Sequence, residues 1–119
     1  MTKRQHPERD EQTAIVQLLK LLGASVYVLG VTRRRSDYQG TMMSAGLPDL
    51  WAVLPLQGSL RAAEPRSRIP LWIEVKAPSG RTSEPQAQFR AECLASQVPH
   101  ILGGLADVES WLRKGGWLK

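Results

Sequence analysis

The chain has 119 residues and a mass of 13.2 kDa, enough for one domain, spanning 1–119, with a single hydrophobic core. Its formal net charge of +5 makes nucleic acid or another polyanion a natural partner, although charge alone does not exclude a generic basic soluble protein. The single cysteine, Cys93, excludes an internal disulfide. The polar start and the absence of a long apolar run lead us to expect a cytoplasmic protein without signal peptide or membrane span.

The first predicted helix follows residues 1–5, which we expect to form a flexible basic tail. Pro7 suits the first helical position and Gly23 the C-terminal stop, so the helix should end near Leu22. Its apolar stripe, typical of a helix packed on one face, consists of Ile15, Leu18, Leu19 and Leu22.

Extended towards the N-terminus, the same stripe reaches Glu8, Glu11 and Gln12. Charged groups on the inward side of a helix are costly unless they find partners, so this first turn can hang over a polar site at the edge of a sheet. The simpler alternative is that the acidic side chains stay solvated and stabilise the helix dipole. Helical geometry alone places Glu8 and Glu11 equally near the stripe.

Three apolar segments predict β-strands, at 24–30, 50–54 and 71–76. The second and third are apolar on both faces, so they should be central in a sheet that is covered by helices. Long polar connections fill 31–45 and 55–70. A loop of that length inside a compact domain is usually functional or mobile.

The C-terminal part predicts a helix, a strand and a second helix. Ser83 can cap a helix that runs to about Gln97, and Gln86 completes a capping box. A strand at 100–103 and a helix at 106–113 follow, so the element order is α-β-β-β-α-β-α. The inward side chains of the first of these helices should be Phe89, Cys93 and Leu94, which makes a buried thiol the expected role of the cysteine.

Two short strings at strand ends carry the predicted chemistry: Pro48-Asp49 opens the second strand, and Glu74-Val75-Lys76 closes the third. Glu74 and Lys76 share a face, and Asp49 on a paired strand can bring a second carboxylate beside them. Two carboxylates and a lysine suit Mg²⁺, which takes oxygen ligands and keeps waters for a phosphate substrate. The alternatives are that Asp49 is a turn or capping aspartate, and that Glu74 and Lys76 lie on a solvated face at a strand end and form a cross-strand ion pair.

The pair Pro48-Asp49 followed by Glu74-x-Lys76 resembles the signature of the PD-(D/E)XK nucleases. Further motif elements extend the resemblance to the VRR-NUC branch, the virus-type replication-repair nucleases, from about Glu8 to the helix near Trp111. These elements are Gly46, the segment 80–83, Gln86, and Glu8 with Gln12. The long interval between Asp49 and Glu74 departs from the pattern. The resemblance implies an α/β, restriction-endonuclease-like fold with a central mixed β-sheet flanked by helices (αβββαβ core).

The resemblance also implies a function: a DNA endonuclease that uses Mg²⁺ or Mn²⁺ and leaves a 5′-phosphate, as a homodimer in phage or bacterial DNA replication and repair. In this assignment the metal is held by Asp49, Glu74 and the Val75 carbonyl. Lys76 positions the attacking water. Glu8, favoured over Glu11 by the family spacing, completes the acidic site, which Gln86 also lines.

Arginines form a second group of candidate residues, for DNA binding: Arg33, Arg34, Arg35, Arg61, Arg66, Arg68, Arg81 and Arg90. Arginine pairs bidentately with phosphate and positions a duplex without reading its sequence. No helix-turn-helix or zinc finger is present for base readout, so selectivity for flaps or junctions is expected. The alternative for the arginines is that they only confer solubility.

The whole chain has two alternative functions. It could be a catalytically weak or inactive DNA-binding module on the same fold, or a basic protein-interaction domain.

Overall fold

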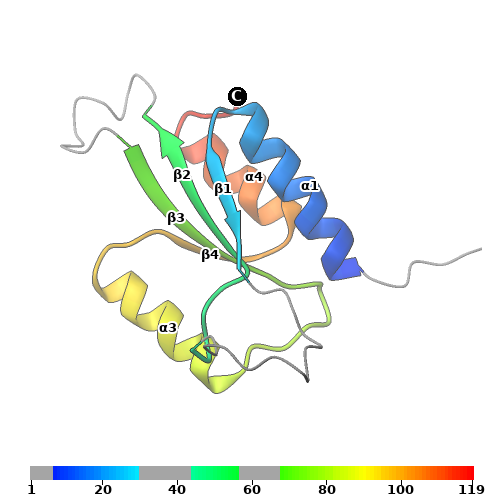
Figure 1. The fold of residues 1–119 in the computed structure, drawn as a ribbon, viewed down its shortest axis with the longest axis vertical. Helices are drawn as coiled ribbons and strands as arrows, with labels where there is room; N and C mark the ends of the chain where they lie inside the picture. Colours follow the sequence, from blue (N-terminus) through cyan, green and yellow to red (C-terminus); the bar gives the residue numbers. More distant parts are fainter. Residues whose placement is uncertain (1–6, 30–43, 57–67) are drawn as a thin grey trace, which may run out of the picture.

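The computed structural model describes residues 7–29, 44–56 and 68–119 (Figure 1). Four strands form one mixed sheet in the order β1-β2-β3-β4, in which the first three are antiparallel and β4 is parallel to β3. The strands are β1 (Ser25–Val28), β2 (Leu50–Pro55), β3 (Arg68–Val75) and β4 (His100–Gly103). The helices are α1 (Pro7–Leu21), α3 (Glu84–Ala95) and α4 (Leu105–Lys114). The predicted fold class, element order and central position of β2 and β3 are confirmed.

Successive side chains of β2 and β3 point to opposite faces of the sheet, and both faces are apolar. Helices therefore cover both faces. α1 and α4 lie side by side on one face, and α3 lies on the other (Figure 1). The first face carries Leu50 and Leu71, which pack with Ile15 and Leu19 of α1 in the main hydrophobic core, and all four are fully buried. The second face carries the remaining strand residues, among them the candidate site.

Strand β3 begins earlier than predicted, at Arg68, and includes Pro70. Proline lacks an N–H for the ladder, but β4 pairs with β3 only from Trp72 onward, so Pro70 lies where β3 has one neighbouring strand. The prediction that Leu94 faces inward is wrong, because its side chain is 52% exposed. Consecutive helical residues are about 100° apart, so burial of Cys93 turns Leu94 outward.

Several predictions concern residues outside the described ranges. These are the tail at 1–5, most of both long connections, and the arginines Arg33, Arg34, Arg35, Arg61 and Arg66. Among residues 7–29, 44–56 and 68–119, no helix is long and apolar enough to cross a membrane.

Candidate functional site

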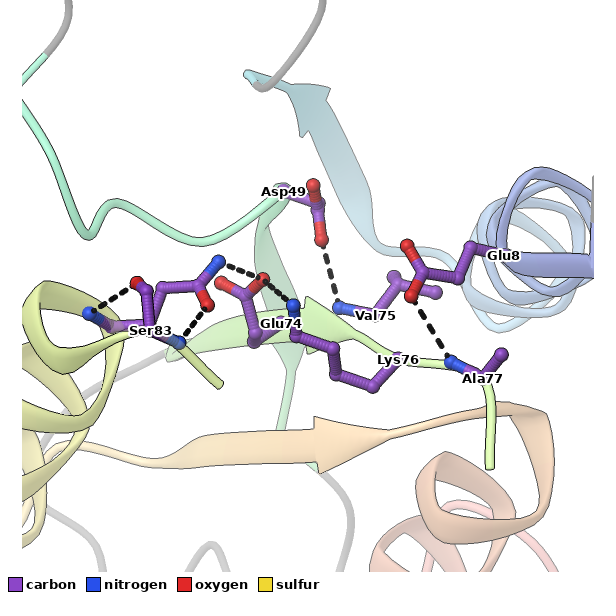
Figure 2. A network of polar contacts seen from close by, with 8 residues as sticks. Glu8, Asp49, Glu74, Val75, Lys76, Ala77 and Ser83 are labelled. Atoms are coloured by element: carbon purple, nitrogen blue, oxygen red, sulfur yellow. Dashed lines mark hydrogen bonds and ion pairs between the residues drawn. The ribbon is translucent and has the colours of Figure 1, made fainter. Parts of the chain in front are cut away.

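The pairing register of β2 and β3 sets the two predicted carboxylates opposite each other. Leu50 is the partner of Ile73, and continuing the register by one residue sets Asp49 opposite Glu74. The Oδ2 atom of Asp49 accepts a hydrogen bond of 2.9 Å from the backbone N–H of Val75, which fixes the aspartate across the strand end (Figure 2). Burial is the main cause that raises the pKa of Asp49.

Glu74 is only 3% exposed, and its two oxygens have different surroundings. Oε2 accepts a hydrogen bond of 2.7 Å from Nε2 of Gln86 and lies 3.8 Å from Nζ of Lys76. Oε1 is buried and has no hydrogen-bond partner among the described residues. Burial, and next the charge of Asp49, raise the pKa of Glu74 to about 7. The site therefore holds more negative charge than its lysine balances.

The donor set fits a divalent cation with an open coordination sphere. No cluster of three His, Cys, Asp or Glu side chains able to enclose a metal occurs in the described parts of the chain. Mg²⁺ does not need such a cage, because it commonly takes one or two carboxylates and completes its octahedron with waters and substrate phosphate. The unpartnered Oε1 of Glu74 is an oxygen ligand of the required kind, and the charge of Asp49 acts on the same carboxyl group.

Glu8 reaches the same strand end from the first turn of α1. Its Oε2 atom accepts a hydrogen bond of 3.3 Å from the backbone N–H of Ala77, directly after Lys76 (Figure 2). Its charge contributes to the raised pKa values of Asp49 and Glu74. The first turn of α1 therefore lies over the site, as one of the two sequence interpretations expected.

Glu11 has a different partner. Its Oε1 atom accepts a hydrogen bond from the backbone N–H of Leu105, the first residue of α4. A carboxylate at that position satisfies one of the free N–H groups of the helix terminus and interacts favourably with the helix dipole. The structure therefore gives Glu11 a role in joining α1 to α4.

This difference predicts unequal effects of two matched substitutions. For the nuclease function that the sequence resemblance implies, Glu8→Gln should lower the single-turnover rate of DNA cleavage by roughly 10–100-fold, because it removes a charge beside the candidate metal ligands. Glu11→Gln should leave that rate nearly unchanged, since the amide oxygen can still accept from Leu105. The measurement is the cleavage rate of both variants on one labelled substrate. A larger loss in Glu11→Gln than in Glu8→Gln would show that Glu11, and not Glu8, belongs to the acidic site.

Gln86 links the start of α3 to the site. It forms a capping box with Ser83, in which its Oε1 accepts from the N–H of Ser83 at 2.9 Å, while its Nε2 donates to Glu74. Gln86 therefore caps the helix and also contacts the candidate site, so its geometry fits both sequence interpretations. The loop before Asp49 packs on the same helix start at Gly46, where φ is +94° and a Cβ atom would lie 2.5 Å from the Pro85 carbonyl oxygen.

Three of the DNA-binding candidates are described, and two of them, Arg81 and Arg68, lie in different places. Arg81 is exposed in the segment between Lys76 and α3, near the site in sequence. Arg68 is exposed at the start of β3, six residues and therefore roughly 20 Å along the strand from Glu74. Arg68 thus lies in a strand far from the carboxylates, so its predicted place in the 55–70 connection is wrong.

Arg90 and His100 form a structural contact that sequence reasoning missed. Nη1 of Arg90 donates to the His100 carbonyl at 3.1 Å and lies 3.0 Å from Nδ1 of the buried ring. Burial, followed by the charge of Arg90, lowers the pKa of His100 to about 4. The ten-residue separation crosses from α3 to β4, so only the fold brings the two residues together.

The lowered pKa of His100 predicts a pH-dependent stability. The unfolded chain takes up this proton near pH 6.5 and the folded chain only near pH 4, so the stabilisation is complete above 6.5 and declines as the pH falls towards 4. Urea unfolding at pH 7 and pH 5 should show a larger loss for the natural chain than for His100→Gln, which has no proton to gain. Equal losses in the two proteins would contradict this assignment.

Comparison with known proteins supports the fold. No protein-family profile and no curated protein matches the chain. A solved structure described as "VRR_NUC domain" is similar, with a TM-score of 0.63 and 19% sequence identity over 89% of this chain and 94% of that one. At this level of identity the likeness establishes the fold. The resemblance to VRR-NUC domains inferred from the motifs is therefore confirmed in the fold of the chain.

Proposed function

We propose that this chain, which has the fold of a VRR_NUC domain, is a metal-dependent DNA endonuclease. The observation that carries the proposal is the carboxylate pair of the partly buried Asp49 and the buried Glu74, set opposite each other with Lys76 as the nearby cation. Burial raises the pKa of both carboxylates, and one buried oxygen of Glu74 has no hydrogen-bond partner within the described structure. A divalent cation, which could at the same time bind a phosphate substrate, would satisfy such a group.

In this proposal each residue has a separate task. Asp49, Glu74 and the Val75 carbonyl would hold Mg²⁺ or Mn²⁺, which when bound would polarise the scissile phosphate and lower the pKa of a water molecule. Lys76 orients the attacking water and offsets the negative charge that develops on phosphate. Gln86 fixes the rotamer of Glu74 through its 2.7 Å hydrogen bond.

Glu8 completes the acidic site and fixes the backbone after Lys76 through its hydrogen bond to Ala77. Attack of the water oxygen on phosphorus, with loss of a proton from that water to solvent, breaks the bond to the 3′ oxygen, which takes up a proton and leaves as a hydroxyl group. The other product strand keeps a 5′-phosphate.

The natural substrate in this proposal is branched or flapped duplex DNA, in phage or bacterial replication and repair, within the cytoplasm. The net charge of +5 supports a polyanionic substrate. Arg81, exposed between Lys76 and α3, is the described arginine best placed to contact phosphate. A homodimer, which would present two sites to a branched substrate, belongs to the same proposal.

The test is a cleavage assay on a set of labelled substrates. The purified protein is incubated with flap, junction, single-stranded and plain duplex DNA, in Mg²⁺, in Mn²⁺ and in EDTA. We expect metal-dependent cleavage with a preference for flap or junction DNA. DNA binding without cleavage in either metal would overturn the proposal in favour of a DNA-binding module, and equal cleavage of all substrates would overturn structure selectivity.

A further inference from the structure

A row of aromatic side chains crosses the sheet beside the carboxylates. Tyr27, Trp51, Trp72 and His100 are register partners on β1, β2, β3 and β4. Trp51 lies two residues from Asp49, and Trp72 two residues from Glu74. Each tryptophan therefore shares the face of its carboxylate at a distance of roughly 6.6 Å along the strand. The row and the candidate site therefore lie on the same face of the sheet.

Helix α3 covers only one end of this row. Phe89 packs edge-on against Trp72, with ring centroids 5.2 Å apart, and its ring centroid lies 6.0 Å from that of His100. At the other end Tyr27 is 54% exposed, although it is a large aromatic residue on a strand. The rings of Trp51 and Trp72 are in contact, with centroids 4.4 Å apart.

Within the described residues, the end of the row that α3 does not cover forms an open cavity of about 510 Å³, lined by Tyr27, Leu29, Trp51, Val53 and Trp72. None of these lining residues carries a charge. The cavity thus offers aromatic faces and aliphatic walls, while the adjacent row of the same sheet carries the candidate catalytic carboxylates. This composition suits a flat, uncharged ring.

We propose that the aromatic row is a stacking platform for an unpaired base of the DNA strand that is cut, an inference that rests on the proposed nuclease function. Bases stack on aromatic side chains without sequence preference, because every base has a π-face. A phosphate bound through a metal ion at Asp49 and Glu74 would leave the neighbouring nucleotide, about one nucleotide step away, over Trp51 and Tyr27. The adjoining phosphates would lie towards Lys76 and Arg81.

The platform explains how the site can select a DNA structure without reading sequence. A base inside a duplex is stacked on both sides and paired, so it reaches an aromatic surface only after unstacking, at a cost of a few kcal/mol. A base in a flap or frayed end is already unpaired and only weakly stacked, so its binding does not require this unstacking energy. The preferred substrate class is therefore DNA with a single-stranded segment at the cut site.

The experiment separates base stacking from charge by using two probes with equal numbers of phosphates. Binding of a labelled oligothymidine of about 12 nucleotides is compared with binding of an abasic oligomer of the same length, in EDTA so that no cleavage occurs. The natural chain should bind the oligothymidine at least roughly tenfold more tightly. Tyr27→Leu and Trp51→Leu should each remove most of that preference.

Val28→Ala is the matched control, because Val28 lies on the same strand as Tyr27, is 49% exposed and points to the opposite face. It should keep the full preference for bases. The salt dependence of binding should be the same in all variants, since no charge is removed. Should Trp51→Leu fail to fold, the exposed Tyr27→Leu still gives the result.

Equal binding of both probes by the natural chain, or an unchanged preference in Tyr27→Leu, would overturn the platform. A lower sedimentation coefficient of Tyr27→Leu without loss of base preference would also overturn the platform. It would show that the aromatic row binds a second copy of the chain and not a base. The outcome is independent of nuclease activity. Cleavage in the substrate assay without a base preference in the binding assay would support the proposed function and reject the platform. A base preference without cleavage would support the platform and reject the proposed function.

Discussion

Asp49→Asn and Glu74→Gln should each abolish DNA cleavage, with a loss of at least about 10³-fold in the single-turnover rate. Each substitution removes a carboxylate from a pair whose geometry is set by the β2–β3 register and by the hydrogen bonds to Val75 and Gln86. DNA binding should stay intact or become tighter, because a negative charge that faces phosphate is lost. The measurement is a single-turnover time course in Mn²⁺ beside a binding titration in EDTA.

Two further variants make this result specific. Lys76→Ala should also lose most turnover, but it should keep metal binding because lysine is not a ligand. Glu92→Gln is the matched control: Glu92 is exposed on α3, and its Oε2 atom accepts a hydrogen bond from Gln88. It should cleave at the rate of the natural chain. Full activity in either Asp49→Asn or Glu74→Gln would exclude the assigned site.

Glu74→Gln should make the metal-free protein more stable by about 2–3 kcal/mol at pH 8. The pKa of Glu74 is raised from 4.5 to about 7 in the folded chain. The stabilisation from binding this proton is therefore complete below pH 4.5 and is lost as the pH rises through 7. At pH 8 the natural chain keeps a charged, buried carboxylate beside Asp49, whereas the glutamine variant does not.

Urea unfolding in EDTA at pH 8 and at pH 5 measures this difference. The gain of the glutamine variant should be largest at pH 8 and small at pH 5, where the natural side chain is already protonated. Added Mn²⁺ should stabilise the natural chain but not the variant, since ligands stabilise the state that binds them. A variant that is less stable than the natural chain at pH 8 would contradict the assigned burial of charge.

Much of this fold follows from local sequence. Apolar residues on both faces of two segments place β2 and β3 at the centre of the sheet, and Ser83 with Gln86 marks the start of α3. The opposition of Asp49 and Glu74 was predictable too. Asp49 lies just before the beginning of β2 and Glu74 near the end of β3, and in an antiparallel pair the beginning of one strand meets the end of the other.

The remaining features depend on contacts between distant parts of the chain. Glu8 and Glu11 lie on one side of α1, and only their partners Ala77 and Leu105, 69 and 94 residues away, distinguish them. The extension of β3 through Pro70 depends on where β4 begins to pair. The aromatic row requires the register of all four strands, since no single strand reveals that its aromatic residue has neighbours in line.

Calorimetric titration of Mn²⁺ into the protein at pH 7 tests the central claim most directly. The account predicts metal binding that releases protons, because Glu74 has a pKa of about 7 and must lose its proton to act as a ligand. Affinity should rise with pH, persist in Lys76→Ala, and be lost or strongly weakened in Asp49→Asn and Glu74→Gln. Binding of equal affinity in all four proteins, or no binding to the natural chain even with DNA present, would contradict the account.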